Sequence, residues 1–305
     1  MRDGALARKS LDDLGLALGA PAVPRRLVET LYRSTDPYEV GVAASFSVAS
    51  PPRALVYYNP RKRGAAFVRR VHATFLAHGL EPSWLGALSE AIPLSRVSTI
   101  AGFDVDASGV PSGTLYFEEL SERLGDHASG LLSDVAKQLR LSAGEDPRAR
   151  VGAPYILAVD FTRRGPERLK VYTFAQPAER GAARDEAAAI SPDLSRAGSP
   201  AAEVLFGDGA CSGYIIQRAY DVDRLVRHKV YRCLPYEQQP TDGAGQQALQ
   251  TLGIEDRTGV AAALLQPSFG TTSVGIAFAP GRDAPEYVSV YQCLLRGDRV
   301  ATGRS

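Results

Sequence analysis

A short strand-like pattern recurs five times along the chain, and this repeat limits the possible folds more than any other feature of the sequence. Each copy ends in a valine or leucine followed by a tyrosine. The five tyrosines are Tyr57, Tyr116, Tyr172, Tyr231 and Tyr291, so consecutive copies stand 59, 56, 59 and 60 residues apart. Such regular spacing indicates one supersecondary unit of just under 60 residues, repeated along the chain.

Each unit contains a second strand-like segment ahead of the tyrosine pattern. The two segments are separated by a turn rich in Gly, Pro, Ser or Asp, which is typical of a β-hairpin. The five preceding segments span residues 38–49, 97–106, 155–163, 213–221 and 272–279. The sequence therefore predicts five hairpins, which contain ten strands.

Helical patterns precede every hairpin, with apolar residues at helical spacing, as at Leu131, Val135 and Leu139. We expect two helices each in the first, second and fifth units, at 6–18 and 24–32, at 65–78 and 83–91, and at 245–252 and 259–265. The third and fourth units show one clear helix each, at 130–141 and 178–189, and 192–200 reads as a loop.

An α+β fold follows from this order of elements. Five ααββ repeats predict a ten-stranded antiparallel β-barrel surrounded by α-helices, because closing the sheet removes its aggregation-prone edges. A TIM barrel is the main alternative, but it needs single parallel strands that alternate with helices. No linker interrupts the repeat, so we expect a single domain over residues 1–305.

Composition excludes several classes of protein. A net charge of +1 over 305 residues argues against a nucleic-acid binder held by a broad basic field. The three cysteines have neither metal-ligand spacing nor the pattern of a disulfide framework. The sequence contains no apolar run of 18 residues, no signal-peptide pattern and no Gly-x-x-x-x-Gly-Lys-Ser/Thr loop. We therefore expect a cytoplasmic protein with reduced thiols and no membrane partner.

The tyrosine strands have two different faces, because strand side chains alternate. One parity is apolar and should pack on the helices; it includes Ala54, Val56, Leu115, Leu169, Val171, Val226, Val230, Val288 and Val290. The other parity carries the tyrosines and most of the charged residues, and should line the lumen. A ten-stranded barrel is wider than the eight-stranded size that side chains can fill, so we expect a cavity.

Two basic pairs, Arg168 with Lys170 and Arg227 with Lys229, share this inner face. A single lysine or tyrosine on a strand would be read as a solvated or core position. Charges in a closed space need an anionic partner, and two like charges on one strand face repel each other. We therefore expect a ligand with dense negative charge, such as a diphosphate. We also expect Lys170→Met to leave the ligand-free protein as stable as before or slightly more stable.

Short motifs on this inner face match one family. Arg168-Leu169-Lys170-Val171-Tyr172 matches an Arg-x-Lys-x-Tyr diphosphate motif, and Asp36-Pro37-Tyr38-Glu39-Val40 matches a first-strand motif. With the repeated ααββ units, these motifs resemble the ABBA (PT-barrel) aromatic prenyltransferases, above all the dimethylallyltryptophan synthase group. The likeness extends over most of the chain at the level of repeats.

Other positions match the family or depart from it. Lys229-Val230-Tyr231 stands where the family often has Gln-x-Tyr, and Thr114 replaces its usual second-repeat lysine. Arg227 and Lys229 are candidates to replace that lysine. Arg53 is assigned as the second-strand arginine, Tyr116 as a shielding tyrosine, and Tyr287 with Tyr291 as the last-strand pair.

The resemblance implies an enzyme that moves a dimethylallyl or longer group from an allylic diphosphate to an electron-rich aromatic acceptor of the indole or tryptophan type. Glu39 would orient the acceptor, unless it is a surface residue at a strand start, and Lys170 would stabilise the leaving diphosphate. The residues implied to bind substrate are Arg53, Arg168, Lys170, Tyr172, Arg227, Lys229, Tyr231, Tyr116, Tyr287 and Tyr291.

No cofactor is expected. Magnesium sites rely on carboxylates together with substrate phosphates, and the chain has no Asp-Asp-x-x-Asp motif. Two alternatives stay open: a transferase of this fold that acts on a peptide or a phenolic acceptor, and a non-catalytic barrel that binds an isoprenoid diphosphate.

Overall fold

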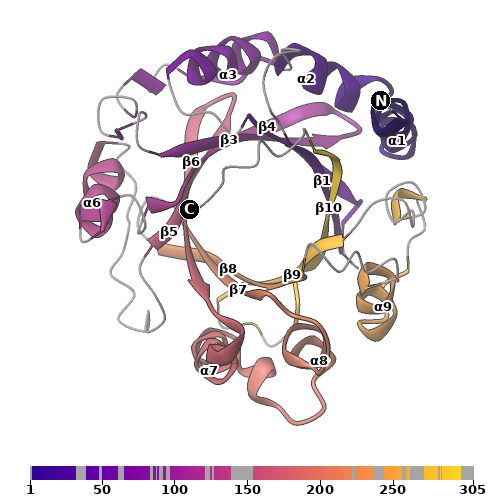
Figure 1. The fold of residues 1–305 in the computed structure, drawn as a ribbon, viewed down its shortest axis with the longest axis vertical. Coiled ribbons are helices and arrows are strands. Elements are labelled where there is room, and N and C mark those ends of the chain that lie inside the picture. The colour runs from indigo at the N-terminus through magenta and orange to yellow at the C-terminus, as the bar shows by residue number, and fades with distance from the viewer. Residues whose placement is uncertain are drawn as a thin grey trace, which may run out of the picture.

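A computed structural model shows a closed barrel with helices on its outer side (Figure 1). The structure describes residues 2–31, 39–47, 50–60, 65–82, 85–86, 88, 92–93, 97–120, 124–125, 127–138, 154–221, 224–235, 244–255, 259–261, 271–280, 282 and 284–296. Within these residues, ten strands form one sheet in which each strand pairs with its neighbours in the sequence.

All ten neighbouring pairs are antiparallel, and the last strand pairs with the first, so the sheet has no free edge. The strands are β1 (Glu39–Phe46), β2 (Arg53–Asn59), β3 (Ser98–Asp106), β4 (Gly109–Glu118), β5 (Pro154–Thr162), β6 (Gly165–Ala175), β7 (Gly213–Asp221), β8 (Arg224–Cys233), β9 (Thr271–Phe278) and β10 (Tyr287–Arg296). The predicted five hairpins and ten strands are confirmed.

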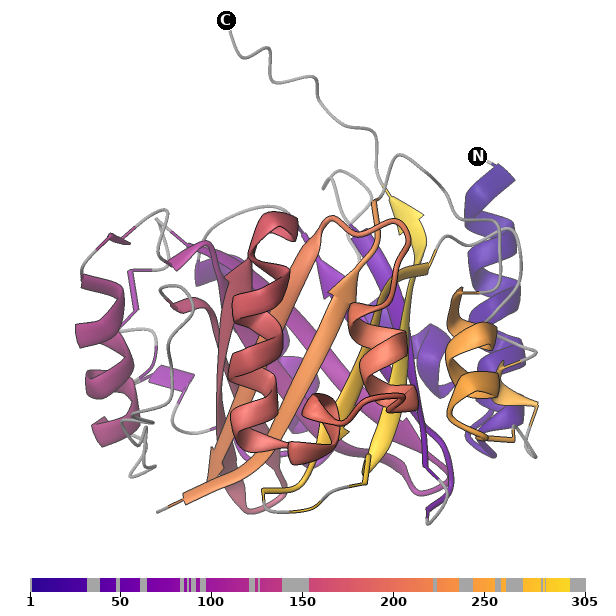
Figure 2. The same ribbon diagram turned by 90° about the horizontal axis from the view of Figure 1, so that it is seen from below.

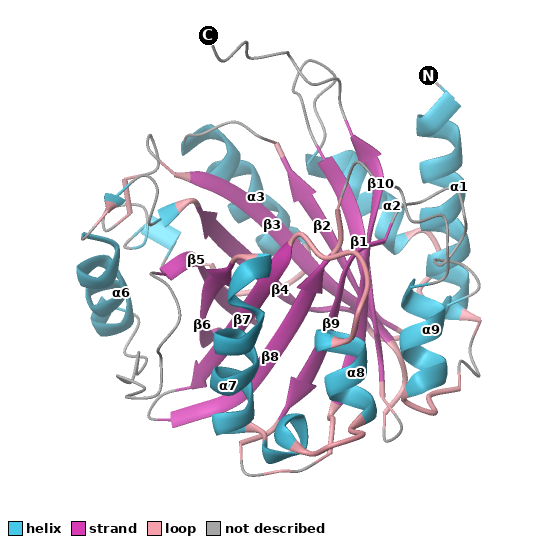
Figure 3. Ribbon diagram, turned by 60° about the horizontal axis from the view of Figure 1, so that its bottom comes forward, coloured by secondary structure: helices cyan, strands magenta, loops and turns pink. Residues whose placement is uncertain are grey.

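The helices pack against the outer face of the barrel and cross its tilted strands (Figures 2 and 3). They are α1 (Arg2–Ala17), α2 (Val23–Leu31), α3 (Ala65–Ala77), α6 (His127–Gln138), α7 (Arg180–Ile190), α8 (Pro200–Phe206) and α9 (Ala244–Thr251). The predicted helices at 83–91 and 259–265 lie largely outside the described residues. None of the helices that the structure describes is both long and apolar enough to span a membrane.

The fourth unit differs from its prediction. The segment predicted as a loop contains a 3-10 turn, η2 (Pro192–Ser195), and α8 begins at the last residue of the segment, Pro200. Ser199 accepts a hydrogen bond from the Ala202 amide at 3.2 Å, and Pro200 occupies the first helical position. Both are start signals of a helix. Seven residues are too few to show a clear helical period, so the cap is what marks this helix.

The strand alternation predicted from the sequence is confirmed. Leu115, Val171, Val230 and Val290 are buried in the large apolar layer between the barrel and the helices. A second, separate apolar cluster lies on the opposite face of the strands, with Tyr172 and Tyr231 at its centre. The barrel therefore has an apolar outer layer that fixes the helices and an inner wall that is free to carry polar chemistry.

Candidate active site

The repeat places inward-facing side chains at matching positions on the strands that carry the repeated tyrosines. Each tyrosine is preceded two and four residues earlier by further inward side chains, nearer the end of the barrel where the two strands of each hairpin meet. On four strands these sets are Ser112, Thr114 and Tyr116 on β4; Arg168, Lys170 and Tyr172 on β6; Arg227, Lys229 and Tyr231 on β8; and Tyr287, Ser289 and Tyr291 on β10. The charged groups thus lie towards the hairpin end, and the tyrosines lie deeper.

The deeper tyrosines form one continuous aromatic wall. The ring centroids of Tyr116 and Tyr172 are 6.2 Å apart, those of Tyr172 and Tyr231 are 6.4 Å apart, and those of Tyr231 and Tyr291 are 5.5 Å apart. The ring of Tyr57 covers Gly41, whose missing Cβ leaves room for it. Burial raises the pKa of Tyr116, Tyr172, Tyr231 and Tyr291, so these rings stay neutral phenols.

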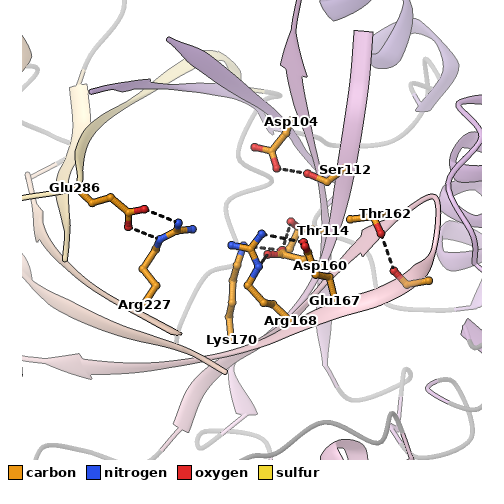
Figure 4. Close-up of polar contacts among 11 residues, drawn as sticks. Asp104, Ser112, Thr114, Asp160, Thr162, Glu167, Arg168, Lys170, Arg227 and Glu286 are labelled. Atoms are coloured by element: carbon orange, nitrogen blue, oxygen red, sulfur yellow. Dashed lines mark hydrogen bonds and ion pairs between the residues drawn. The ribbon is translucent and has the colours of Figure 1, made fainter. Parts of the chain in front are cut away.

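A buried carboxylate, Asp160 of β5, lies between the inward groups of β4 and β6 (Figure 4). It accepts a hydrogen bond from Thr114 Oγ1 at 2.6 Å and pairs with Lys170 Nζ at 2.6 Å, while Arg168 Nε lies at 3.9 Å. Burial alone would raise the pKa of Asp160, but the charges of Lys170 and Arg168 outweigh it and lower the pKa. The carboxylate is therefore ionised.

Asp160 corrects the expectation that Lys170 and Arg168 simply repel each other until an external anion binds. The protein supplies a first anion itself, and it binds both cations. Removing the charge of Lys170 would leave the buried Asp160 carboxylate with fewer partners, so we now expect Lys170→Met to lower the stability of the ligand-free protein.

The two members of the second basic pair, Arg227 and Lys229, have different environments. Arg227 is paired with a carboxylate, that of Glu286. Its Nε and Nη2 donate to the two oxygens of Glu286 at 2.9 and 3.0 Å, and its guanidinium lies 5.1 Å from the ring centroid of Tyr287. Burial would raise the pKa of Glu286, but the bonds and charge of Arg227 lower it. The pair is a charge-assisted, bidentate contact.

Lys229, the other member, has hydroxyl and aromatic partners. Its Nζ donates to Ser289 Oγ at 2.8 Å and to Tyr291 Oη at 3.2 Å, and among the described residues no carboxylate forms an ion pair with it. Nζ also lies 4.7 to 5.1 Å from the ring centroids of Tyr231, Tyr287 and Tyr291. Burial, and then the charges of Lys170 and Arg227, lower the pKa of Lys229 well below its usual value.

A glycine allows this lysine to reach its partners. Lys229 is on β8 and Ser289 is on β10, so the side chain must cross β9. It crosses at Gly275, where an added Cβ would lie 2.8 Å from Lys229 Cε and 2.7 Å from Tyr231 Cδ1. Contacts this short require movement, so Gly275 is a requirement for the observed position of the amine.

The remaining predicted residues are placed less centrally. Arg53 is exposed at the start of β2, at the hairpin end of the barrel. Glu39 begins β1, where its backbone pairs with Asn59 and Arg296, and its side chain lies outside what the structure describes. The structure brings together the other nine predicted positions, from Tyr116 to Tyr291, on four strands of one lumen.

The sequence analysis did not predict four polar residues of the lumen: Asp104, Asp160, Gln217 and Glu286. Asp104 Oδ2 accepts from Ser112 Oγ at 2.5 Å, and burial raises the pKa of Asp104. Gln217 Oε1 accepts from Tyr231 Oη at 2.7 Å. A signal existed for Asp160, since alternation along the 155–163 strand predicts that its side chain faces the lumen.

Among the residues that the structure describes, no three His, Cys, Asp or Glu side chains gather as metal ligands.

Comparison with solved structures identifies the fold. The 5-dimethylallyl tryptophan synthase of Streptomyces coelicolor, in complex with DMASPP and Trp, superposes with a TM-score of 0.72 over 99% of each chain at 14% identity. A 6-dimethylallyl tryptophan synthase gives a TM-score of 0.73 over 95% of this chain and 96% of the other, at 18% identity. The protein has the prenyltransferase-barrel fold.

A third similar structure with this barrel is the prenyltransferase PriB, in a ternary complex with L-tryptophan and dimethylallyl thiolodiphosphate. It covers 99% of both chains with a TM-score of 0.68 at 16% identity. No protein-family model matches the sequence, and no curated protein matches it either. The likeness to the prenyltransferase barrels therefore lies in the fold and not in overall sequence identity.

Proposed function

We propose that this prenyltransferase barrel moves an allylic group, such as dimethylallyl, from its diphosphate to an electron-rich aromatic acceptor. One observation carries the proposal: the inward cations Arg168, Lys170 and Arg227 on β6 and β8 adjoin a continuous wall of tyrosines in one lumen. Such a site suits a ligand that is strongly anionic at one end and cation-like at the other. The similar barrels solved with DMASPP or dimethylallyl thiolodiphosphate and tryptophan support the same interpretation.

The diphosphate of the donor would bind to Arg168, Lys170 and Arg227, with Arg53 at the rim. Charge-assisted hydrogen bonds from these groups would stabilise the negative charge that develops as the C–O bond breaks. Asp160 and Glu286 hold these cations at their places when no donor is bound. The donor must compete with both carboxylates, which makes the site selective for a ligand of higher charge density.

The allyl group would lie against the deeper tyrosines. Their π faces stabilise a cation-like carbon fragment and keep out water that would otherwise trap it. Neutral phenols suit this role, because an ionised phenolate would itself react with the allyl cation. We place the acceptor ring next to this wall and assign Glu39, at the start of β1, to accept a hydrogen bond from its N–H or O–H group.

An indole or tryptophan acceptor is the specific form of this proposal. The test is incubation of the purified protein with labelled C5, C10 and C15 allylic diphosphates and a panel of tryptophan, other indoles, phenols and short peptides, with products identified by mass spectrometry. We expect a prenylated indole product from the C5 donor. Donor binding without any product across the panel would favour a carrier and refute the proposal.

A further inference from the structure

Donor binding does not explain the environment of Lys229, an ionisable group of the lumen. Lys229 is buried and donates hydrogen bonds to Ser289 and Tyr291 on β10. A lysine that served only as a phosphate ligand would be expected to hold its charge, yet this amine has no carboxylate partner among the described residues. Burial of an unpaired ammonium is costly, whereas a neutral amine is tolerated.

The proposed reaction requires a proton acceptor. Breaking the C–O bond of the donor sends its electron pair to the diphosphate, and the ring uses a π pair to form the new bond to the allyl carbon. The attacked ring atom must then lose its hydrogen, with the bonding pair returning to the ring, to restore aromaticity. A base near the tyrosine wall has to take that proton.

Other bases in the described lumen are less suited to this step. Asp160 is bound by Lys170 and Thr114, and Glu286 is bound by both arms of Arg227, so each carboxylate is stabilised in its ionised form. Asp104 stands on β3 and accepts a hydrogen bond from Ser112. Lys229 Nζ, in contrast, lies against the rings of Tyr231 and Tyr291, which belong to the wall where the allyl group and the acceptor would meet.

A route for the proton continues from Lys229. Ser289 Oγ, its hydrogen-bond partner, lies 2.6 Å from Ser45 Oγ of β1, and either hydroxyl can be the donor in that bond. Ser45 pairs with Arg53 at the exposed hairpin end of the barrel. The amine, Ser289 and Ser45 therefore form a hydrogen-bonded line from the aromatic wall to the rim.

We infer that Lys229 is the base that removes the proton from the alkylated aromatic ring, and that Ser289 and Ser45 relay this proton towards solvent. The inference rests on the proposed function. The lone pair of Nζ takes the proton and becomes an ammonium. The three tyrosine rings and the two hydroxyl partners then stabilise that ammonium.

The surrounding charges suit this cycle. Burial, Lys170 of β6 and Arg227 of β8 favour the neutral amine, while Asp104 of β3 opposes them. The other titratable groups that face Nζ are the phenols of Tyr231, Tyr287 and Tyr291, whose pKa values are raised by burial. Since the base must be neutral, kcat should rise with pH through the pKa of Lys229 in the loaded enzyme and then level.

The test compares wild-type protein with Lys229→Met, using dimethylallyl diphosphate with L-tryptophan and with ring-deuterated L-tryptophan. In the variant we expect kcat to fall roughly 100-fold or more. A primary isotope effect on kcat should appear or grow, because loss of the ring hydrogen becomes limiting. The rising limb of the kcat–pH profile should vanish, and the KM for the donor should change little.

The controls separate this inference from its alternatives. Lys137→Met, at an exposed position of α6, should behave as wild type. Ser289→Ala keeps the amine and removes the relay hydroxyl, so it should slow the same step, and an unchanged rate would refute the relay. A Lys229→Met enzyme with a raised donor KM, an unchanged kcat and no new isotope effect would show a phosphate ligand and overturn the inference. Absence of any wild-type product from tryptophan, indoles, phenols or peptides would instead refute the proposed function.

Discussion

The pairing of Lys170 with Asp160 makes one side chain serve both stability and donor binding. We predict that Lys170→Met lowers the free energy of unfolding by about 2 kcal/mol, because it leaves the buried carboxylate with Thr114 and the more distant Arg168. We also predict that donor binding weakens by about 2 kcal/mol, the loss of a hydrogen bond to a charged group. Urea unfolding and donor titration measure the two effects separately.

A double variant provides the matched control for this pair. Lys170→Met with Asp160→Asn removes both charges and should recover most of the lost stability, while donor binding stays weak. An unfolding free energy of Lys170→Met equal to that of wild type would show that Asp160 does not depend on Lys170.

The acceptor side of the site is tested at Glu39. If this carboxylate accepts a hydrogen bond from the acceptor ring, Glu39→Gln should slow prenyl transfer roughly 100-fold, in the range of a positioned acid–base group. Donor affinity should hardly change, because the cations lie on other strands. Transfer at the wild-type rate would indicate that Glu39 is only a surface residue at the start of a strand.

A buried polar cluster joins α7 to the outer face of the barrel. Arg218 of β7 forms an ion pair with Glu186 of α7, and His228 of β8 is the register partner of Arg218. Burial, and then the charge of Arg218, lower the pKa of His228 to about 3. The histidine therefore stays neutral in the folded protein over the whole physiological range.

This cluster predicts how stability depends on pH. Below pH 6.5 the unfolded chain binds a proton at His228 that the folded protein does not bind. The contribution of His228 to the free energy of unfolding is therefore fully present above pH 6.5 and decreases as the pH falls towards 3. The loss should be about 2 kcal/mol between pH 6.5 and 5. Urea unfolding at pH 7.5 and 5.0 should show a steeper loss for wild type than for His228→Gln, and equal losses would contradict the assignment.

The barrel could be predicted because its sequence signal is periodic. Part of the site could not be predicted, because no periodic signal marks those residues. Regular tyrosine spacing and period-two alternation placed Lys170, Tyr172 and Lys229 in the lumen. The partner of Lys170 depends on cross-strand register, which shifts next to Asp160 between Asp160 and Phe161. Glu286 precedes β10 and has no strand parity to follow. The direction that Lys229 takes depends on Gly275, a neighbour far away in sequence.

The carboxylates Asp160 and Glu286 are paired with cations, and no cluster of metal ligands occurs among the residues that the structure describes, so we propose that the site needs no metal. Excess EDTA should change the rate of prenyl transfer at most a few-fold, because Arg168, Lys170 and Arg227 supply the positive charge at the leaving group. Complete loss of turnover that added Mg²⁺ restores would contradict this prediction.

One measurement tests whether the barrel transfers the allyl group while its tyrosines exclude water. Wild-type protein is incubated with labelled dimethylallyl diphosphate and the aromatic acceptor that the panel identifies, beginning with L-tryptophan, and pyrophosphate and prenylated acceptor are quantified in the same reaction. We predict equal amounts of the two products and little pyrophosphate when the acceptor is omitted. Pyrophosphate without prenylated acceptor, or tightly bound donor with neither product, would contradict the account.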